Sequence, residues 1–389
     1  MEYRKLEKTG DQLSLLGYGC MRFPRKNGQI DVKKAEQQVY EAIEKGVNYF
    51  DTAYNYPGSE ETLGKILKKE DRKKVKIATK IALPSVKSRE DIDKLFEKQL
   101  KRLQTDYVDY FLIHNLGSIG EWEEYKQLGI LNFIKQEQKN GRIINFGFSF
   151  HGNIVNFKKI VDDYNWDCAM IQYNYLDDKY QAGKEGLDYA ASKGLGIIIM
   201  EPLKGGLLVD KLPNEAKEII NNYEVKKSPG AWGLSFVGDN PNVNVILSGM
   251  NDEKIIEENL NLFKEFKANS LTDNDKNMLN SVKEEINKAM AVSCTNCGYC
   301  IPCPQKIDIP MCFSFYNDKV MFGTINSRAM YLFNTFKNAS ASACTKCGTC
   351  EKKCPQNIPI MEELENVDKQ MDNFFLRIIG KLVMKIMYR

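Results

Sequence analysis

The stretch "DVKKAEQQVYEAIEKGVNYFDTA", residues 31–53, joins a helical pattern directly to a strand pattern. Residues 31–46 carry apolar side chains at helical spacing, with Asp31 as the expected N-cap and Gly46 as the expected C-cap. Residues 47–53 form a short and almost continuously apolar run, which is typical of a strand buried on both faces. A helix followed at once by such a strand indicates an α/β fold.

The same alternation continues on both sides of this stretch, from about Leu13 to about Met250, with a second clear helical pattern over 88–104. Eight segments qualify as strands: 13–21, 47–53, 75–80, 107–114, 143–150, 168–175, 195–202 and 243–250. Eight βα units within this length predict a (β/α)8 TIM barrel. The alternative is a doubly wound sheet. That fold favours a G-x-G-x-x-G turn after its first strand, and "GYGCMR" (17–22) does not match it.

The C-terminal part of the chain contains an internal repeat. "CTNCGYCIPCPQKIDIPM" begins at residue 294, and "CTKCGTCEKKCPQNIPIM" begins at residue 344. The chain has 11 cysteines and begins with a charged segment that lacks an apolar export signal. We therefore expect a cytoplasmic protein whose thiols bind metal rather than form disulfides.

The spacing within the two runs points to iron rather than zinc. The first run has Cys294, Cys297, Cys300 and Cys303, and the second has Cys344, Cys347, Cys350 and Cys354. Three thiolates at this spacing, with a fourth before a proline, resemble the two-cluster ferredoxins, in which the fourth cysteine of each run binds the other cluster. Zinc, the alternative, prefers paired C-x2-C units. Cys20, Cys168 and Cys312 belong to neither run, and we expect them to be ordinary packed cysteines.

The ferredoxin resemblance implies a specific set of ligands. The first 4Fe–4S cluster would take Cys294, Cys297, Cys300 and Cys354, and the second would take Cys344, Cys347, Cys350 and Cys303. The first run departs from the family pattern, because two residues rather than three precede its last cysteine.

Polar residues end three neighbouring strand candidates. Asp51, Lys80 and His114 stand at the C-terminal ends of their segments, and Tyr56 follows Asp51 in "DTAYNYPGSE". In TIM barrels the catalytic residues project from these ends. These four residues therefore form a candidate catalytic group.

This constellation resembles the aldo-keto reductase family over roughly residues 1–265, and the four residues match the catalytic tetrad of that family. The resemblance implies that Tyr56 protonates a carbonyl oxygen while a nicotinamide delivers hydride. A tyrosine has an ordinary pKa of about 10, and a nearby ammonium group lowers it. Lys80 would supply that charge, Asp51 would orient Lys80, and His114 would orient the substrate.

The family resemblance also implies a site for NADP(H) or NAD(H). Ser149 and Gln172 would hold the carboxamide, residues 201–206 the pyrophosphate, and residues 248–259 the adenosine phosphate. The implied contacts are Met21, Ser149, Gln172, Met200, Leu203, Gly205, Gly206, Ser248, Gly249, Met250, Glu258 and Asn259. Phe150 replaces the asparagine usual after the serine, and Met200 replaces an aromatic residue. The arginine often used for a 2′-phosphate falls at Ile255, beside Lys254, so the choice between NADP and NAD stays open.

The chain is expected to have four parts: a barrel over 1–270, a helical connector over 271–290, a ferredoxin-like domain over 291–361, and an amphipathic helix over 362–389. The last helix carries a basic stripe at Arg377, Lys381, Lys385 and Arg389. It would pack on the rest of the protein or, alternatively, contact a membrane surface or a partner. A net charge of +3 implies no nucleic-acid partner.

The whole chain resembles the iron–sulfur-containing aldo-keto reductases of anaerobic bacteria and archaea. A nicotinamide delivers two electrons as hydride, each cluster takes one, and the sequence shows no fingerprint of a flavin that would bridge them. Three functions remain. The first is a reductase of a small carbonyl or other reducible substrate, in which the barrel site exchanges electrons with the clusters or with a ferredoxin-like carrier. The other two are a carbonyl reductase with structural clusters and a nicotinamide-binding redox sensor.

Overall fold

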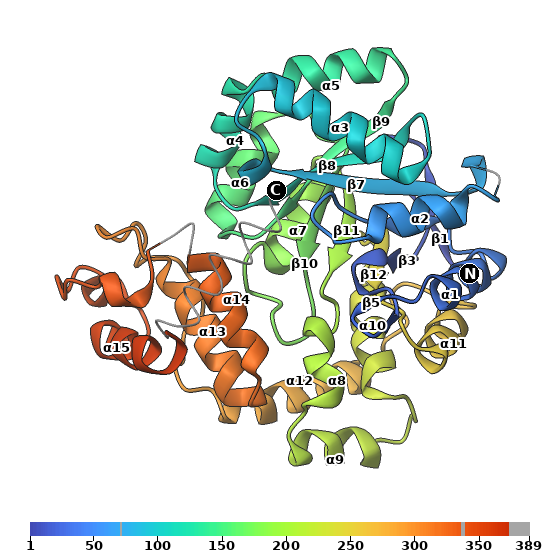
Figure 1. Cartoon of the computed structure of the whole chain (residues 1–389). Coiled ribbons are helices and arrows are strands. Elements are labelled where there is room, and N and C mark those ends of the chain that lie inside the picture. The colour runs from blue at the N-terminus through green and yellow to red at the C-terminus, as the bar shows by residue number, and fades with distance from the viewer. Residues whose placement is uncertain (71, 336–338, 373–389) are drawn as a thin grey trace. The chain divides into compact units, whose positions relative to one another are not determined.

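The computed structural model describes residues 1–70, 72–335 and 339–372 (Figure 1). It divides into two compact units. The barrel unit comprises Met1–Gly205 and Gly230–Thr272, and the cysteine unit comprises Gly206–Pro229 and Asp273–Arg389. The segment 206–229 lies within the range that the sequence analysis assigns to the barrel, but it belongs to the cysteine unit.

The barrel unit is built on a closed barrel of eight parallel strands, which confirms the predicted TIM barrel and rules out the doubly wound sheet (Figure 1). Each strand pairs with the next in chain order, and the last pairs with the first. The strands are β3 (Leu16–Gly19), β6 (Tyr49–Asp51), β7 (Lys76–Ala82), β8 (Val108–Leu116), β9 (Ile143–Phe150), β10 (Cys168–Gln172), β11 (Gly196–Met200) and β12 (Val245–Ser248).

Helices follow the strands along the chain. They are α1 (Val32–Glu44), α2 (Ser59–Leu67), α3 (Arg89–Leu103), α4 (Ile119–Gln127), α5 (Ile130–Lys139), α6 (Ile154–Asp163), α7 (Gly183–Ser192), α10 (Pro229–Asp239) and α11 (Glu253–Leu262). Two antiparallel hairpins complete the unit: β1 (Tyr3–Lys5) with β2 (Gln12–Ser14), and β4 (Arg25–Lys26) with β5 (Gln29–Ile30).

The two helices expected from the sequence form with the expected ends. The Asp31 side chain accepts a hydrogen bond from the Lys34 amide at 3.1 Å, which caps α1. Gly46 takes a φ of 96° just beyond that helix, a conformation that glycine adopts without strain. At α3, Ser88 and Asp91 form a capping box.

The strand register explains how the candidate site arises. Successive residues of a strand point to opposite faces, so every second residue faces the barrel interior. The interior is filled by a layer of apolar side chains that includes Tyr49, Ala78, Leu112, Met170 and Ile198. Two residues further along the same five strands stand Asp51, Lys80, His114, Gln172 and Met200. The candidate residues therefore occupy the next inward-facing layer, at the C-terminal ends of the strands.

Five strand candidates form shorter barrel strands than the sequence predicts: 13–21, 47–53, 168–175, 195–202 and 243–250. The segment 168–175 ends as a strand at Gln172, because the Asn174 side chain accepts hydrogen bonds from the amides of Leu176 and Asp177 and forms a turn there. The segment 13–21 contributes to β2, β3 and a short 3₁₀ helix, η1 (Cys20–Arg22).

The chain after the last barrel strand forms two helices, α11 and α12 (Asp273–Lys288), and α12 lies within the helical connector expected over 271–290. The connection between the two helices is fixed by Asp239. Its carbonyl oxygen accepts from the Asn269 amide at 2.9 Å, and its carboxylate accepts from the Leu271 amide at 2.9 Å. These bonds hold the backbone in a non-helical path between α11 and α12.

The cysteine unit contains α8 (Leu207–Asp210), α9 (Asn214–Asn222), α12, α13 (Ile309–Phe322), α14 (Ile325–Thr335) and α15 (Ile360–Met371). Helix α9 packs on α12, and the Tyr223 hydroxyl donates to the Asp275 carboxylate at 3.0 Å. Helix α13 packs against α14 and α15. The buried core of the cysteine unit includes Val292, Ile307, Cys312, Phe313, Tyr331, Leu364 and Val367.

The expected C-terminal helix is present in part. Helix α15 begins at Ile360, and residues 373–389, which carry the basic stripe at Arg377, Lys381, Lys385 and Arg389, lie outside the described residues. Within the described part of the chain, none of the helices combines the length and the apolar character needed to cross a bilayer.

Candidate active site and candidate metal centres

A buried ion pair forms the base of the candidate active site. Lys80 Nζ lies 2.7 and 2.6 Å from the two carboxylate oxygens of Asp51, and it donates a third bond to the Thr52 carbonyl at 2.8 Å. Lys80 is 1% exposed and Asp51 is 4% exposed. Burial raises the pKa of Asp51, and the Lys80 ammonium opposes that shift. The pair satisfies all three donors of the ammonium.

Tyr56 and His114 stand above this pair and are half-buried. Lys80 Nζ lies 5.2 Å from the centre of the Tyr56 ring, and the Tyr56 and His114 rings meet edge to face with centroids 5.6 Å apart. Strands β6, β7 and β8 and the loop after β6 thus bring all four candidate catalytic residues together. A phenol beside an ammonium and an imidazole can donate a proton to an acceptor placed between them.

A second buried network, which the sequence analysis did not find, fixes the loop that carries Tyr56. Glu60, at the start of α2, accepts hydrogen bonds from the Thr79 hydroxyl at 2.6 Å, the Gln99 amide at 2.9 Å and the Arg102 guanidinium at 3.1 Å. Gln99 also donates to the Lys80 carbonyl at 3.0 Å. Burial raises the pKa of Glu60, and its three donors oppose the shift. Helix α3 is thereby connected to both Lys80 and the Tyr56 loop.

The two residues expected to hold a carboxamide lie on neighbouring strands. Ser149 on β9 is buried, and its hydroxyl accepts from the Asn115 amide at 2.8 Å. The Gln172 amide on β10 donates to the Asp177 carboxylate at 2.9 Å. Lys204 also reaches that carboxylate, at 2.8 Å, and both partners of this ion pair are largely buried. Asp177 therefore anchors Gln172 and the 201–206 segment together.

The segment 201–206, which is expected to face the pyrophosphate, contains several residues with positive φ. Glu201, Lys204, Gly205 and Gly206 have φ values of 53°, 49°, 68° and 100°. Arg22, which the sequence analysis did not select, donates to the Gly205 carbonyl at 3.1 Å. It lies 183 residues away along the chain, so only the fold could reveal the contact.

The remaining expected cofactor residues differ in how accessible they are. Met21 is 58% exposed, Glu258 is exposed, and Met200 and Leu203 are half-buried against the barrel core. Ser248 and Asn259 are buried and hydrogen-bonded to each other at 3.0 Å. The Met250 side chain is fully buried, so a ligand there would meet its backbone.

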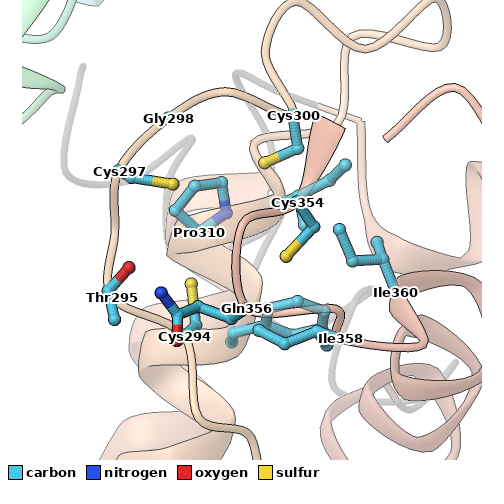
Figure 2. Close-up of a pocket in the computed structure, with 12 residues that line it drawn as sticks. Cys294, Thr295, Cys297, Gly298, Cys300, Pro310, Cys354, Gln356, Ile358 and Ile360 are labelled. Atoms are coloured by element: carbon cyan, nitrogen blue, oxygen red, sulfur yellow. The ribbon is translucent and has the colours of Figure 1, made fainter. Parts of the chain in front are cut away.

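The first cysteine set lines one cavity. Cys294, Cys297 and Cys300 come from the first run and Cys354 from the second. Figure 2 shows the four thiols directed toward one another across this space. Apolar side chains complete the lining: Ile309, Pro310, Phe313, Ile358 and Ile360. Burial raises the pKa of Cys300 to about 12, and the neighbouring Cys294 adds to the shift.

The second cysteine set lies against the same apolar core. Cys350 is buried, Cys303 and Cys344 are half-buried beside the core, and Cys347 is exposed. Burial raises the pKa of Cys350, and the nearby Cys344 contributes to the shift. The backbone amide and the hydroxyl of Thr349 lower the pKa of Cys347. Cys20, Cys168 and Cys312 are buried free thiols, as expected for packed cysteines.

The sequence repeat is also a repeat of backbone conformation. Asn296 and Lys346 stand at equivalent positions and have φ values of 57° and 55°. Gly298 and Gly348 follow with 77° and 70°. Such left-handed residues turn successive amide groups toward one point and form concave sites for anionic groups, including iron–sulfur clusters.

The donor set of the first cavity suits an iron–sulfur cluster. Four thiols from separate turns surround one apolar space, and the backbone there is of the kind that accommodates an anionic cluster. No group of three or more histidine, cysteine, aspartate or glutamate side chains in the described residues is arranged around a single metal ion. The four thiols are therefore spaced for a group larger than a single metal ion, as an iron–sulfur cluster is.

Comparisons with known proteins agree with both parts of this description. The model of the aldo/keto reductase family matches residues 15–284, and that of a 4Fe-4S dicluster domain matches residues 293–358. The chain is 28% identical to L-galactose dehydrogenase of Arabidopsis thaliana over 67% of its own length and 87% of the relative. It is 24% identical to a probable voltage-gated potassium channel subunit beta of Oryza sativa, over 67% of its length and 90% of the relative.

A solved structure shares the barrel. An aldo-keto reductase of Bacillus halodurans in its holo form superposes with a TM-score of 0.60 at 25% identity, covering 72% of this chain and 96% of that one. The family match extends over well more than half of the chain, and the dicluster match covers both cysteine runs. The protein therefore belongs to the aldo/keto reductase family, in a form that carries a C-terminal 4Fe–4S dicluster domain.

Proposed function

We propose that this protein is an NAD(P)H-dependent oxidoreductase that reduces the carbonyl group of a small molecule, with Tyr56 as the general acid. The observation that carries the proposal is the buried Lys80–Asp51 ion pair, with the Tyr56 ring 5.2 Å from the ammonium and His114 edge-on to that ring. Membership of an oxidoreductase family supports it.

Each residue of the group has one task in this reaction. The bound nicotinamide supplies the hydride. Tyr56 donates its hydroxyl proton to the carbonyl oxygen as negative charge develops there, and the Lys80 ammonium stabilises the resulting phenolate. Asp51 holds the ammonium in place, and His114 donates a hydrogen bond to the same oxygen. The carbonyl thus gains one hydride and one proton and becomes an alcohol.

The dinucleotide would be held by residues of the barrel strands and their following loops. Ser149 and Gln172 would take the carboxamide, Met21, Met200 and Leu203 would flank the nicotinamide, and residues 205–206 the pyrophosphate. The adenosine end would lie along Ser248, Gly249, Met250, Glu258 and Asn259. NADP and NAD both remain candidates, since position 255 is isoleucine.

The first test of this proposal is Tyr56→Phe. It should lower the rate of reduction of an activated aromatic aldehyde by about 10²- to 10⁴-fold, because it removes the proton donor but keeps the ring. Affinity for NADPH and NADH, measured by quenching of tryptophan fluorescence, should not change. An unchanged rate would contradict the role of Tyr56. Binding of nicotinamide without turnover in the wild type would favour a redox-sensing protein instead.

The eight cysteines of the two runs would hold two 4Fe–4S clusters, the first on Cys294, Cys297, Cys300 and Cys354 and the second on Cys303, Cys344, Cys347 and Cys350. When bound, each cluster takes up or releases one electron, so the pair matches the two electrons of one hydride. A ferredoxin or another one-electron carrier is the partner that suits such a pair. All eleven cysteines are free thiols, which suits a reducing compartment such as the cytoplasm.

Coupling between the clusters and the barrel site can be tested in protein purified without oxygen. The clusters are reduced with dithionite, the excess is removed, and NADP⁺ or NAD⁺ is added while the electron paramagnetic resonance signal and the nicotinamide absorbance are followed together. Coupling predicts one NAD(P)H for every two reduced clusters that lose their signal, with uptake of one proton. Clusters that stay reduced beside bound nicotinamide would favour a structural role.

A further inference from the structure

Exposed lysines flank the exposed cysteine of the second run. Cys347 is exposed, Lys346 precedes it, and Lys352 and Lys353 follow it, all three with exposed side chains. The Lys352 amide donates to the Gly348 carbonyl at 3.4 Å, so the backbone folds back onto the turn directly after Cys347. These three lysines form the lysine turn, which places positive charge where the second cysteine set meets solvent.

Two carboxylates lie near the lysine turn, and neither neutralises it. The Glu351 carboxylate accepts a hydrogen bond at 2.8 Å from an amide in the first turn of α15. Lys346 forms an ion pair with Glu365, and both side chains of this pair are exposed to solvent. Exposed ion pairs are weak, so a carboxylate of a partner can replace Glu365. Among the described residues, Lys352 and Lys353 form no ion pair.

The first run lacks this charge at its equivalent positions. Cys297 is also exposed, but no charged residue occurs from 294 to 303. Asn296 stands where the second run has Lys346, and the two residues have left-handed φ values of 57° and 55°. Asparagine is favoured in this conformation and lysine is not, so the backbone does not account for the lysine. The two clusters would therefore present different charges to an approaching protein.

We propose that the lysine turn is the docking surface for an acidic one-electron carrier protein of the ferredoxin type, and that electrons enter through the second cluster. This inference rests on the proposed function, because it requires a cluster on Cys303, Cys344, Cys347 and Cys350. One electron leaves the reduced carrier, which becomes oxidised, and reduces the cluster; no bond forms and no proton moves. Positive charge around an exposed redox centre raises the rate of encounter with a negatively charged partner. Electron-transfer complexes bury little surface, so a few charges can dominate their formation.

The test measures binding of an oxidised acidic two-cluster ferredoxin to the oxidised full-length protein, purified without oxygen. Biolayer interferometry gives the association rate and the dissociation constant at several ionic strengths. No electron moves between the oxidised partners, so this measurement does not depend on activity. Iron content is determined for every variant.

Three variants are compared with the wild type. Lys352→Gln/Lys353→Gln removes the unpaired lysines, and Lys346→Asn introduces the residue found at the same left-handed position of the first run. The matched control is Lys211→Gln/Lys226→Gln. Both of these lysines are exposed and belong to the same unit, but they lie in the segment 206–229, whose helix α9 packs on α12.

Lys352→Gln/Lys353→Gln should weaken ferredoxin binding by about 10-fold at low ionic strength, mainly through slower association. Lys346→Asn should cause a smaller loss, because Glu365 already offsets part of its charge. The control should match the wild type, and the differences should shrink as salt screens the charges. In stopped-flow experiments, cluster reduction by reduced ferredoxin should slow in the double variant. Reduction by the methyl viologen radical, a small cation, should not slow.

Unchanged ferredoxin affinity in both lysine-turn variants, or an equal loss in the control, would overturn the proposal. Wild-type protein that bound vesicles of equal phosphatidylcholine and phosphatidylserine, but not the ferredoxin, would overturn it as well. If the double variant lost iron, Lys346→Asn would decide alone, because asparagine keeps the backbone conformation of the turn. A wild type that holds both clusters but binds no ferredoxin would refute only the docking surface. A wild type with iron for one cluster would refute the second cluster and that part of the proposed function.

Discussion

The tetrad and the cysteine cavity are two sites built in different ways. Lys80 and Asp51 are fixed by strands whose backbone hydrogen bonds close a barrel. Gln99 adds to this support, because its side-chain amide donates to both the Lys80 carbonyl and the Glu60 carboxylate. Three thiols of the first cavity lie in a stretch from residue 291 to 308 that has neither helix nor strand, and the fourth, Cys354, directly follows a short 3₁₀ helix (Glu351–Lys353). The barrel site is therefore held by bonds within the protein, whereas we expect the shape of the cysteine site to depend on the group that it binds.

The largest expected effect tests the cysteine side of this comparison. Cys354→Ala should lose the first cluster, about half of the iron, although Cys354 belongs to the second run, because its thiol completes the first cavity. Helical content of the cysteine unit should fall, since cluster binding and folding are coupled. Iron content and far-ultraviolet circular dichroism measure both effects.

Tryptophan emission provides the internal reference for that experiment. The three tryptophans of the chain, Trp122, Trp166 and Trp232, all lie in the barrel unit and are fully buried. Their emission should therefore not change in Cys354→Ala. Cys312→Ala, in the same unit but outside the cavity, is the matched control and should keep its iron. A Cys354→Ala protein with full iron content would contradict the crossed arrangement of ligands.

The next largest effect tests the barrel side. Lys80→Met leaves the Asp51 carboxylate buried without its cation, which should lower the free energy of unfolding by about 3–5 kcal/mol. The rate of carbonyl reduction should fall by about 10²-fold or more, because the phenolate of Tyr56 loses its stabilising charge. Chemical denaturation followed by tryptophan emission measures the first effect.

The double variant Lys80→Met/Asp51→Asn separates the two roles of the pair. It removes the buried charge together with its partner, so much of the stability should return while the rate stays low. Recovery of the rate along with stability would show that Lys80 acts only through packing. That result would remove the ammonium from the proposed mechanism.

The smallest expected effect is the pH dependence of the contribution that Glu60 makes to the free energy of unfolding. Burial raises the pKa of Glu60 in the folded state, so the folded protein holds this proton at pH values where the unfolded chain has released it. The contribution of Glu60 to stability should then decrease as pH rises above its unfolded pKa of about 4.5. Glu60→Gln lacks this ionisation. The difference in unfolding free energy, wild type minus Glu60→Gln, should be greater at pH 5 than at pH 8.

The sequence predicted the architecture because buried parallel strands have a distinctive pattern. Each of the eight barrel strands overlaps one expected segment, although β7 and β8 continue two residues beyond theirs. Asp51, Lys80 and His114 could be selected because polar residues are unusual at such positions. The end of β10 was not predicted, since Asn174 stops the strand through a local side-chain turn. The break between α11 and α12 depends on Asp239, a residue of the preceding helix.

The residues that sequence reasoning missed act through contacts distant along the chain. Glu60 meets Gln99 and Arg102, and Arg22 meets Gly205, across separations that no local pattern encodes. The crossed ligand sets, which remain a prediction, could be put forward from the sequence for the opposite reason. Its spacing repeats within a short segment, and the repeat extends to the left-handed residues Asn296, Gly298, Lys346 and Gly348.

The division of the chain has a consequence for how the protein can be taken apart. The polypeptide passes between the two units at three points, after residues 205, 229 and 272. A fragment that begins at residue 273 would contain every cysteine of both runs but would lack α9, the helix that packs on α12. One proteolytic cut at residue 272 would leave α9 attached to the barrel fragment. Excision of the cluster-bearing half as an independent module therefore requires a linker that restores residues 206–229, rather than a simple truncation.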